Sequence, residues 1–290
     1  GSVRMQTAAG LPVNGPCVNA STWNSCIGFI AGISMLIQRY HGLTENVQQI
    51  QGYCYISVMI DIPDTGKGTS VIRLTPARCN IWVVSRNGRS IVVDTGISFD
   101  RSRIANALER KGLIPEAVVL THTHFDHAGN AAWLQAEYGA EVVVQEDESA
   151  MLAAGEMPIP GGTYTFTRGL VSIGRKIEQV FRYDPCIADN VFTDHFDLNR
   201  FGINGFIIHT PGHSPGGATV VIDGEIALAG DSVIGTMPGS PFPPFADDVK
   251  VLIGTWKKII DTGCRIILPG HGKPVSREEM ISEYNRRGTG

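Results

Sequence analysis

One stretch of the sequence restricts the fold more than any other: residues 117–130, which read AVVLTHTHFDHAGN. A short apolar run ends at Thr121, which is typical of a buried β-strand, and the Ala-Gly-Asn near its end indicates the start of a helix. Four potential metal ligands lie between the two elements, within six residues: His122, His124, Asp126 and His127. We therefore expect a strand that carries metal ligands to the beginning of a helix.

Imidazoles and carboxylates are the side chains that bind zinc and similar divalent ions. His122 and His124 are two residues apart in an extended segment, so both point to the same side, whereas Asp126 and His127 lie on the turn into the helix. One ion does not comfortably use all four, so the pattern favours the two histidines on one ion and the Asp-His pair on a second ion about 3.5–4 Å away. The alternative is a polar loop that only forms hydrogen bonds. Three of the eight histidines in one six-residue window argue against it.

The string HTHFDH resembles the HxHxDH signature of the metallo-β-lactamase superfamily, a group of mostly dinuclear zinc hydrolases. Three further motifs agree with the family pattern in order and context: TPGHSPGG with His213, ALAGDS with Asp231, and LPGHGKP with His271. A VVDTG stretch carries Asp94, so the matches span residues 94–272. The resemblance implies an α/β fold, a four-layer αββα sandwich with the metals at one edge between two sheets. Strands grouped in two runs, each flanked by helices, suit the same architecture.

The resemblance also implies a role for each matching residue. It assigns one ion to His122, His124 and His213, a second ion to Asp126, His127 and His271, and a bridging position to Asp231. A hydroxide that bridges the two metals would be the nucleophile, with Asp231 and Asp126 as catalytic residues. Asp94 is predicted to hold a ligand or its loop by a hydrogen bond, the alternative being a turn-capping Asp after a strand. His195 and His209 have no place in the pattern, and neither is expected to bind metal.

Asp231 also restricts the class of reaction, because true metallo-β-lactamases carry a different residue type at the matching position. The resemblance then points to the branches that cleave esters, thioesters, lactones or phosphodiesters. Glyoxalase-II-type thioesterases add a glutathione-binding helical region after the last His, whereas 19 residues follow His271 here, so a glutathione thioester is disfavoured. We expect hydrolysis of a small carboxylic ester, thioester or lactone, by a thioesterase or lactonase that is glyoxalase II-like in its metal motifs. Zinc is the expected metal, with iron or manganese as alternatives.

Four other functions stay open at this point. A mononuclear iron persulfide dioxygenase of the same fold would use ligands of the His122, His213 and Asp231 type. A β-lactamase or phosphodiesterase is less favoured, and a binding module that has kept the fold is disfavoured by the full ligand set. The stretch 237–245, MPGSPFPPF, suits either an apolar pocket wall or a packed connection.

Composition limits the partners. The formal net charge is −4 and no Lys/Arg cluster occurs, so nucleic acid is not expected. Six cysteines without CxxC spacing favour reduced thiols in a cytoplasmic enzyme. The apolar run 27–37 is about half the ~20 residues that a membrane-spanning helix needs, so no membrane association is expected.

The chain divides into two predicted parts. Residues 1–52 form an extension with a loop and an apolar helix, which packs on the domain or makes a homodimer contact, and residues 53–290 form the catalytic domain. Within the domain we expect four antiparallel strands, from the runs YISVMIDI, TSVIRL, NIWVVSR and SIVVDT. Further helices and strands follow, whereas residues 155–200, interrupted by Pro158, Pro160 and Gly161, are predicted to be largely irregular, with some helical or strand character only in 171–182.

Overall fold

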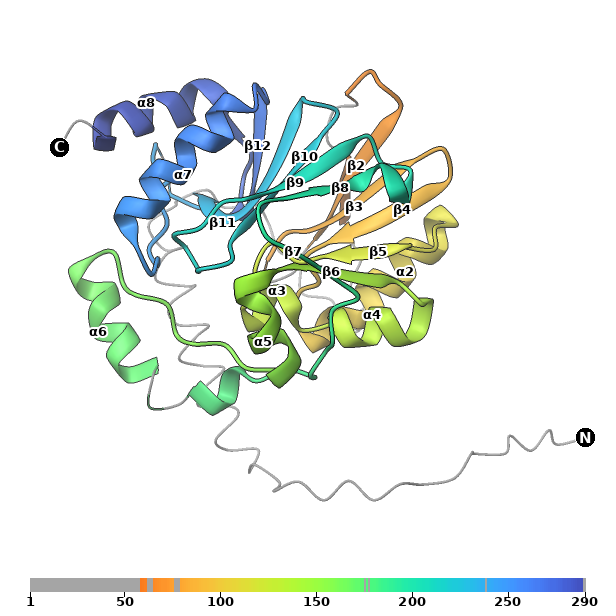
Figure 1. The fold of residues 1–290 in the computed structure, drawn as a ribbon, viewed down its shortest axis with the longest axis horizontal. Coiled ribbons are helices and arrows are strands. Elements are labelled where there is room, and N and C mark those ends of the chain that lie inside the picture. Colours follow the sequence, from red (N-terminus) through yellow and green to blue (C-terminus); the bar gives the residue numbers. More distant parts are fainter. Residues whose placement is uncertain are drawn as a thin grey trace, which may run out of the picture. The chain divides into compact units, whose positions relative to one another are not determined.

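The structure is a computed structural model that describes residues 58–61, 65–75, 79–174, 176, 178–237 and 239–288. These residues form two β-sheets and flanking helices (Figure 1). The predicted extension, residues 1–52, lies outside the described residues, so its packing and dimer contact stay predictions. No helix in the described ranges is long and apolar enough to cross a membrane.

The first sheet has the strand order β1-β2-β3-β4-β5-β6-β7. Its strands are β1 (Val58–Asp61), β2 (Thr69–Thr75), β3 (Ile81–Arg86), β4 (Arg89–Val93), β5 (Ala117–Val119), β6 (Glu141–Gln145) and β7 (Asn190–Phe192). The first four pair antiparallel, as the sequence predicts, and β4 to β7 pair parallel. Asp94 follows β4, and His122 comes shortly after the neighbouring β5. Because parallel strands end at the same edge, the sheet brings these two residues together.

The second sheet has the order β13-β12-β11-β10-β9-β8. Its strands are β8 (His195–Asp197), β9 (Gly205–His209), β10 (Ala218–Ile222), β11 (Ile226–Gly235), β12 (Ile266–Gly272) and β13 (Val275–Ser276). Strands β11 and β12 pair parallel, and the other neighbours pair antiparallel. Asp231 lies in β11, His271 lies in β12, and His213 lies on the turn between β9 and β10. This sheet therefore supplies the other three predicted ligands.

Alternating side chains build three apolar cores. In β4, Ile91 and Val93 belong to the core between the sheets, whereas Val92 faces the helices outside the first sheet. In β10, Ile222 joins the central core and Val221 faces the helices outside the second sheet. Successive residues of a strand point to opposite faces, so each sheet is buried on both. The predicted four-layer αββα sandwich is confirmed.

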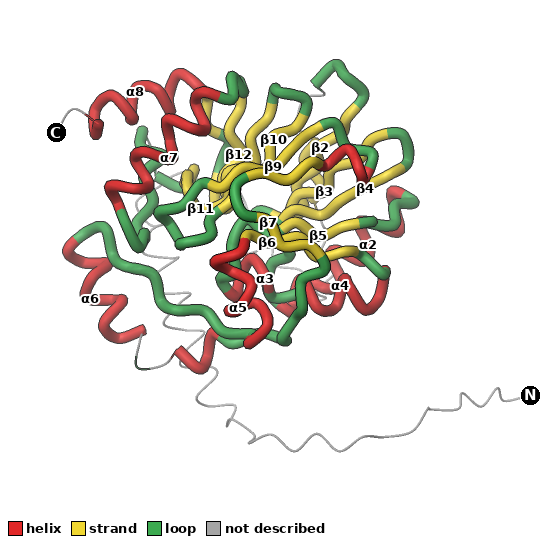
Figure 2. Tube along the Cα trace, in the orientation of Figure 1, coloured by secondary structure: helices red, strands yellow, loops and turns green. Residues whose placement is uncertain are grey.

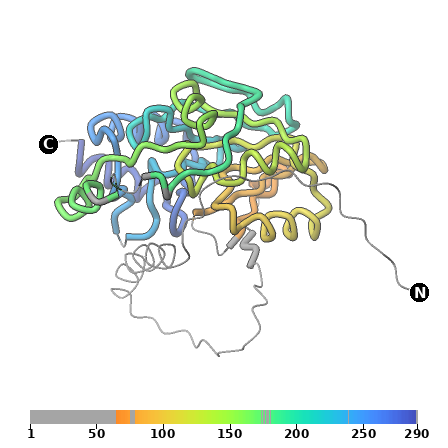
Figure 3. The backbone as a smooth tube through the Cα atoms, turned by 90° about the horizontal axis from the view of Figure 1, so that it is seen from below, coloured from red at the N-terminus to blue at the C-terminus, as the bar shows by residue number. Residues whose placement is uncertain are grey.

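Helices cover the two outer faces of the sheets (Figure 2). The helices are α2 (Arg101–Lys111), α3 (Phe125–Ala128), α4 (Ala131–Tyr138), α5 (Glu146–Ala154), α6 (Thr165–Gly174), α7 (Val249–Asp261) and α8 (Arg277–Gly288), with 3-10 turns η1 (Ser98–Asp100), η2 (Glu178–Phe181) and η3 (Leu198–Phe201). Ile104 of α2 and Leu152 of α5 pack against the first sheet, and Trp256 of α7 packs against the second. Trp256 also donates its Nε1–H to the carbonyl of Ser232 at 2.7 Å, beside Asp231. Figure 3 shows the first sheet's orange strands and the blue C-terminal helices on different sides of the domain.

The prediction for residues 155–200 was wrong in part, since the segment contains α6, β7, β8 and two 3-10 turns. The hydroxyl of Thr167 accepts a hydrogen bond from the N–H of Tyr164 at 3.0 Å and so starts α6 within a Pro- and Gly-rich stretch. Strands β7 and β8 have three residues each, and their pairing partners β6 and β9 lie elsewhere in the chain. A three-residue strand is too short to show an alternating pattern, so only its partners reveal it.

Candidate metal centre

Loops from both sheets meet at one place and bring together the seven predicted ligands. These side chains form overlapping groups whose ligand atoms lie within 4.8 Å of one another: His122, His124 and His213; His122, His127 and Asp231; Asp126, His127 and His271. The first sheet supplies the ligands of the loop after β5, and the second supplies the rest. The local strings HTHFDH, PGH, GD and GHG therefore converge only because the two sheets pack face to face.

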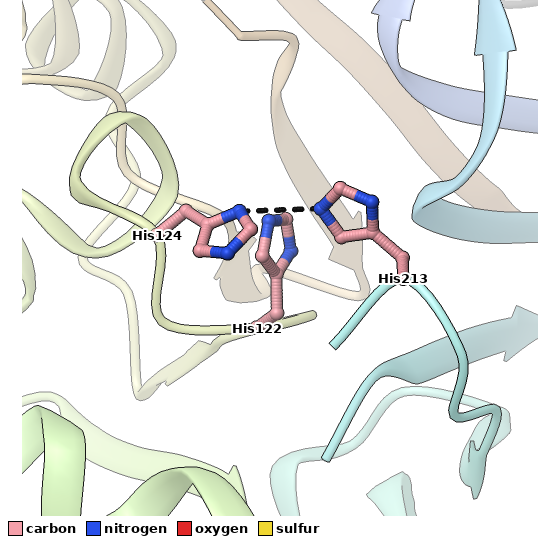
Figure 4. A group of neighbouring side chains, drawn as sticks. All are labelled: His122, His124 and His213. Atoms are coloured by element: carbon pink, nitrogen blue, oxygen red, sulfur yellow. Dashed lines mark hydrogen bonds between the residues drawn. The ribbon is translucent and has the colours of Figure 1, made fainter. Parts of the chain in front are cut away.

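The first group contains three imidazoles that face one another (Figure 4). Nε2 of His213 lies 3.2 Å from Nδ1 of His124. The ring of His122 lies beside both, with ring centroids 4.4 Å from His124 and 4.8 Å from His213. All three residues are buried. Each imidazole thus presents a nitrogen toward a common volume from which water is largely excluded.

The remaining groups share His127, and Asp231 lies close to the ligands of both. Nε2 of His271 lies 3.3 Å from Nε2 of His127 and 3.5 Å from Oδ2 of Asp126. Oδ1 of Asp231 is 3.5 Å from Nε2 of His127, and its Oδ2 is 3.4 Å from Nε2 of His271. The same Oδ2 is 3.8 Å from Nε2 of His213. Asp231 therefore lies between the three-histidine group and the group of Asp126, His127 and His271.

The donor set fits bound cations. His213 donates from Nδ1 to the carbonyl of Phe245 at 2.9 Å, and Nδ1 of His127 lies 2.8 Å from Oδ2 of Asp94. A neutral imidazole that donates from Nδ1 presents a lone pair at Nε2, the atom that faces the other ligands. Nε2 of His122 and Oδ1 of Asp231 are buried and have no hydrogen-bond partner within the described part of the chain. Buried polar atoms nearly always have a partner, and a divalent ion would be that partner here.

The charges of the cluster favour the binding of a cation. Burial and the neighbouring imidazoles lower the pKa of His122 and of His124 well below the usual range, so both are neutral, which is the form that binds metal. Burial also lowers the pKa of His127, but Asp94 and Asp231 outweigh burial and raise it to about 10, so a cation that binds at Nε2 displaces a proton there. Burial raises the pKa of Asp231, and the nearby His271 and His127 outweigh burial and lower it. Asp231 is thus an anion that draws cations to the centre.

One side of the centre is open. The side chains of Asp126 and His271 are 18% and 23% exposed, and that of Asp231 is 11% exposed. The side chain of His127 is fully buried, and that of His213 is 5% exposed. A substrate therefore reaches the cluster from the side formed by Asp126, Asp231 and His271.

Asp94 holds the first sheet's ligands by hydrogen bonds. Its Oδ1 accepts from the N–H of Thr121 at 2.9 Å, and its Oδ2 accepts from the Thr121 hydroxyl at 2.8 Å and faces His127. The Thr121 hydroxyl lies 3.1 Å from Nδ1 of His122. Asp94 thus contacts both the loop that carries the ligands and one ligand, beyond the capping of a turn.

The two remaining described histidines lie outside the metal groups. His195 stacks on Phe206 with ring centroids 5.3 Å apart, and Nε2 of His209 lies 2.9 Å from the carbonyl of Pro215. His41 lies outside the described residues. The stretch 237–245 is a packed connection at its centre, because Phe242 is 3% exposed and belongs to the core under α7. Its last residue, Phe245, orients His213 through its carbonyl.

Two residues that support the ligands were not predicted from the sequence. Asn80 donates from Nδ2 to the carbonyls of Pro269 and Gly272, and from its backbone N–H to Gly270, so it brackets His271 on both sides. Glu148 accepts hydrogen bonds from both loops of the three-histidine group. Neither lies near a ligand motif in the sequence. Burial of their polar side chains is the signal that identifies them, and it appears only in the folded chain.

Comparison with known proteins agrees with the fold and the motifs. Residues 74–271 match the family model of the metallo-beta-lactamase superfamily. "Probable metallo-hydrolase YqgX" of Bacillus subtilis (strain 168) is 25% identical over 157 residues, 54% of this chain and 66% of that protein. Hydroxyacylglutathione hydrolase of Dechloromonas aromatica (strain RCB) is 38% identical over 82 residues, 28% of this chain and 29% of that protein. The chain thus spans less than two thirds of the length of these two relatives.

A solved structure shows the same fold. The crystal structure of the BLEG-1 B3 metallo-beta-lactamase superposes with a TM-score of 0.58 at 21% identity, covering 78% of this chain and 97% of that one. The family model covers most of the present chain, so the protein belongs to the metallo-beta-lactamase superfamily. The prediction of this family is confirmed, and with it membership of a superfamily of metallo-hydrolases.

Proposed function

We propose that this protein is a hydrolase that uses two divalent metal ions, with zinc as the preferred metal, on a carboxylic ester, thioester or lactone. The observation that supports the proposal is the position of Asp231 between the three-histidine group and the group of Asp126, His127 and His271. Two ligand groups with one carboxylate between them suit two adjacent ions. The solvent-facing side of the cluster gives a substrate access to both.

The chain's own residues have distinct tasks in this reaction. Two bound ions would supply a nucleophile from water at neutral pH and stabilise the negative charge that develops on the substrate's carbonyl oxygen. Asp231 holds the two halves of the centre together. Asp126, on the solvent-facing side, is placed to accept or steer a proton. Asp94 fixes the ring of His127, so that Nε2 faces the centre throughout the reaction.

Three observations support a carbonyl substrate. The hydroxyacylglutathione hydrolase relative has a name that describes hydrolysis of an acyl thioester, and the match covers 82 residues. The net charge of −4 supplies no general attraction for a nucleic-acid backbone. The bridging Asp is the residue type that the sequence resemblance connects with ester, thioester and lactone cleavage. We expect uncharged or monoanionic substrates, since the metal cluster attracts the carbonyl oxygen by itself.

A substrate panel tests the proposal. The purified protein is assayed with lactones, aryl esters, acyl thioesters, phosphodiesters and β-lactams, with and without a chelator, and its metals are quantified by mass spectrometry. We expect the first three classes to react fastest, chelation to abolish turnover, and zinc to restore it. A clear preference for phosphodiesters or β-lactams contradicts the substrate assignment. One iron per chain with oxygen consumption on persulfides would instead identify the dioxygenase alternative.

A further inference from the structure

Helix α5 carries a buried carboxylate that belongs to none of the metal motifs. Glu148 lies in the first turn of α5 and is 1% exposed. Its Oε2 accepts a hydrogen bond from the backbone N–H of Thr123 at 2.9 Å and another from the Thr123 hydroxyl. Its Oε1 accepts from the N–H of Gly216 at 3.1 Å. Charge-assisted hydrogen bonds of this kind are about twice as strong as neutral ones.

The two donors belong to the two loops that supply the three-histidine group. Thr123 lies between His122 and His124, and both its backbone N–H and its hydroxyl point to Glu148. Gly216 follows His213 by three residues, on the turn between β9 and β10. One carboxylate therefore spans from the first sheet's ligand loop to the second sheet's ligand loop.

Helix α5 packs so closely against the turn between β9 and β10 that no side chain fits at Gly216. A Cβ atom on Gly216 would lie 2.5 Å from Cγ of Glu148 and 2.5 Å from Oε1 of Gln145. Gln145 is the N-cap of α5, and its side chain accepts from the N–H of Asp147 at 2.6 Å. The capped first turn of α5 is thus a rigid support against which both ligand loops are fixed.

We propose that Glu148 is a positioning residue for the three-histidine half of the metal centre. By holding Thr123 and Gly216, it sets the spacing between the His122–His124 pair and His213. The other half has a separate support, because Asp94 holds His127. Asp94 also bonds Thr121, next to His122, whereas Glu148 bonds the two loops of the three-histidine half, so loss of Glu148 should affect mainly that half. The inference rests on the proposed metal centre but not on the identity of the substrate.

Metal affinity tests the inference. Metal-free Glu148→Gln and unsubstituted protein are titrated with Zn²⁺ against a competing chelator dye, which gives an affinity for each ion. Glutamine has the size of glutamate, but its amide nitrogen cannot accept a hydrogen bond. We expect one of the two ions to bind ~10–100-fold more weakly, the usual effect of losing a residue that orients a ligand. Glu146→Gln, an exposed position in the same helical turn, is the matched control and should leave both affinities unchanged.

A double-substitution cycle assigns the affected half. His271→Ala removes a ligand of the other half, so in this background Glu148→Gln should lower the affinity for the remaining ion by the same factor as in the unsubstituted protein. His124→Ala removes a ligand of the three-histidine half, so in that background Glu148→Gln should cause no further loss of zinc affinity. Thr123→Val, which removes only the hydroxyl donor, should cause a smaller loss at the same ion and keeps the test valid should Glu148→Gln fail to fold.

Two results would overturn the inference: unchanged zinc affinity in Glu148→Gln, or equal weakening of both ions with a lower melting temperature of the metal-free protein. The second result would indicate a general structural role. The zinc titration tests the positioning role of Glu148, and the substrate panel tests the proposed reaction. One proposal can therefore be contradicted while the other is upheld.

Discussion

Asp94 adopts φ 58°, a left-handed backbone conformation that is uncommon for residues other than glycine. Its carboxylate accepts hydrogen bonds from Thr121 and faces the ring nitrogen of His127. Unfavourable backbone conformations persist where surrounding contacts fix them, and they gather at functional sites. The backbone conformation and the hydrogen bonds of Asp94 together support its role as the residue that orients His127.

Asp231→Ala is the most direct test of a single ligand. Removal of the carboxylate between the two groups should lower the metal content below two ions per chain and reduce turnover to background, because both halves lose a shared ligand. The fold should largely remain, since Asp231 lies at the edge of the core beside a solvent-facing side. Elemental analysis, an activity assay and circular dichroism measure the three effects. Normal metal content together with a normal rate would remove Asp231 from the bridging position.

Two histidines outside the metal groups are the matched controls. His195→Ala and His209→Ala should keep both metals and the rate of the unsubstituted protein, because their contacts are with Phe206 and the Pro215 carbonyl. Loss of a metal in either variant would show that a ligand has been misassigned.

At the scale of elements, α8 holds the connection between β11 and α7. Glu283 of α8 is 4% exposed and accepts from the Ser240 hydroxyl at 3.1 Å, and it pairs with Arg286 and Arg287. The guanidinium carbon of Arg287 lies 3.6 Å from the ring centroid of Phe242, a cation–π contact. The same connection leads to Phe245, whose carbonyl orients His213. A C-terminal helix thus reaches the metal centre through a packed loop.

Glu283→Gln should therefore destabilise the protein in a pH-dependent way. Burial raises the pKa of Glu283, but hydrogen bonds from Arg286 and Arg287 outweigh burial and lower it. A lowered folded-state pKa stabilises the fold above the unfolded pKa of about 4.3, and this stabilisation is lost as the pH falls through the folded value. We expect a loss of about 1.5–3 kcal/mol at pH 7, the usual range for hydrogen bonds to charged groups.

Thermal melting between pH 3 and pH 8 measures this effect. The difference in melting temperature between Glu283→Gln and the unsubstituted protein should be constant from pH 5 to pH 8 and should close below about pH 4. Glu278→Gln, an exposed position in the first turn of the same helix, should show no difference at any pH. Equal melting temperatures at pH 7 would contradict the predicted role of Glu283.

At the scale of the whole molecule, the N-terminal segment remains a prediction from the sequence. Seven apolar residues crowd the stretch 27–37: Ile27, Phe29, Ile30, Ile33, Met35, Leu36 and Ile37. So much apolar surface is costly to leave in water, so we expect it to pack on the domain or on a second copy. Deletion of residues 1–52 should lower solubility or change the oligomeric state, measured by light scattering. A truncated protein of unchanged solubility, stability and mass would contradict this.

The sequence by itself determined the ligand types, their order and the strands that carry them. His122, His124, Asp126 and His127 are neighbours in the chain, so one short string supplies four of the seven predicted ligands. The strand predicted from SIVVDT is present as β4, and the two-residue period of a strand puts Ile91 and Val92 on opposite faces of the sheet. These features are local, and local patterns can be read without knowledge of the fold.

The tertiary structure decided which ligands share a group and what holds them. Asp231 lies between the halves because β11 pairs with β12 in the second sheet and both sheets pack on one core. Glu148 bonds Thr123 and Gly216, which are 25 and 68 residues away from it in the chain, and no local pattern connects them. The packing of distant segments creates these contacts, because burial leaves each polar group only the partners that the folded chain brings to it.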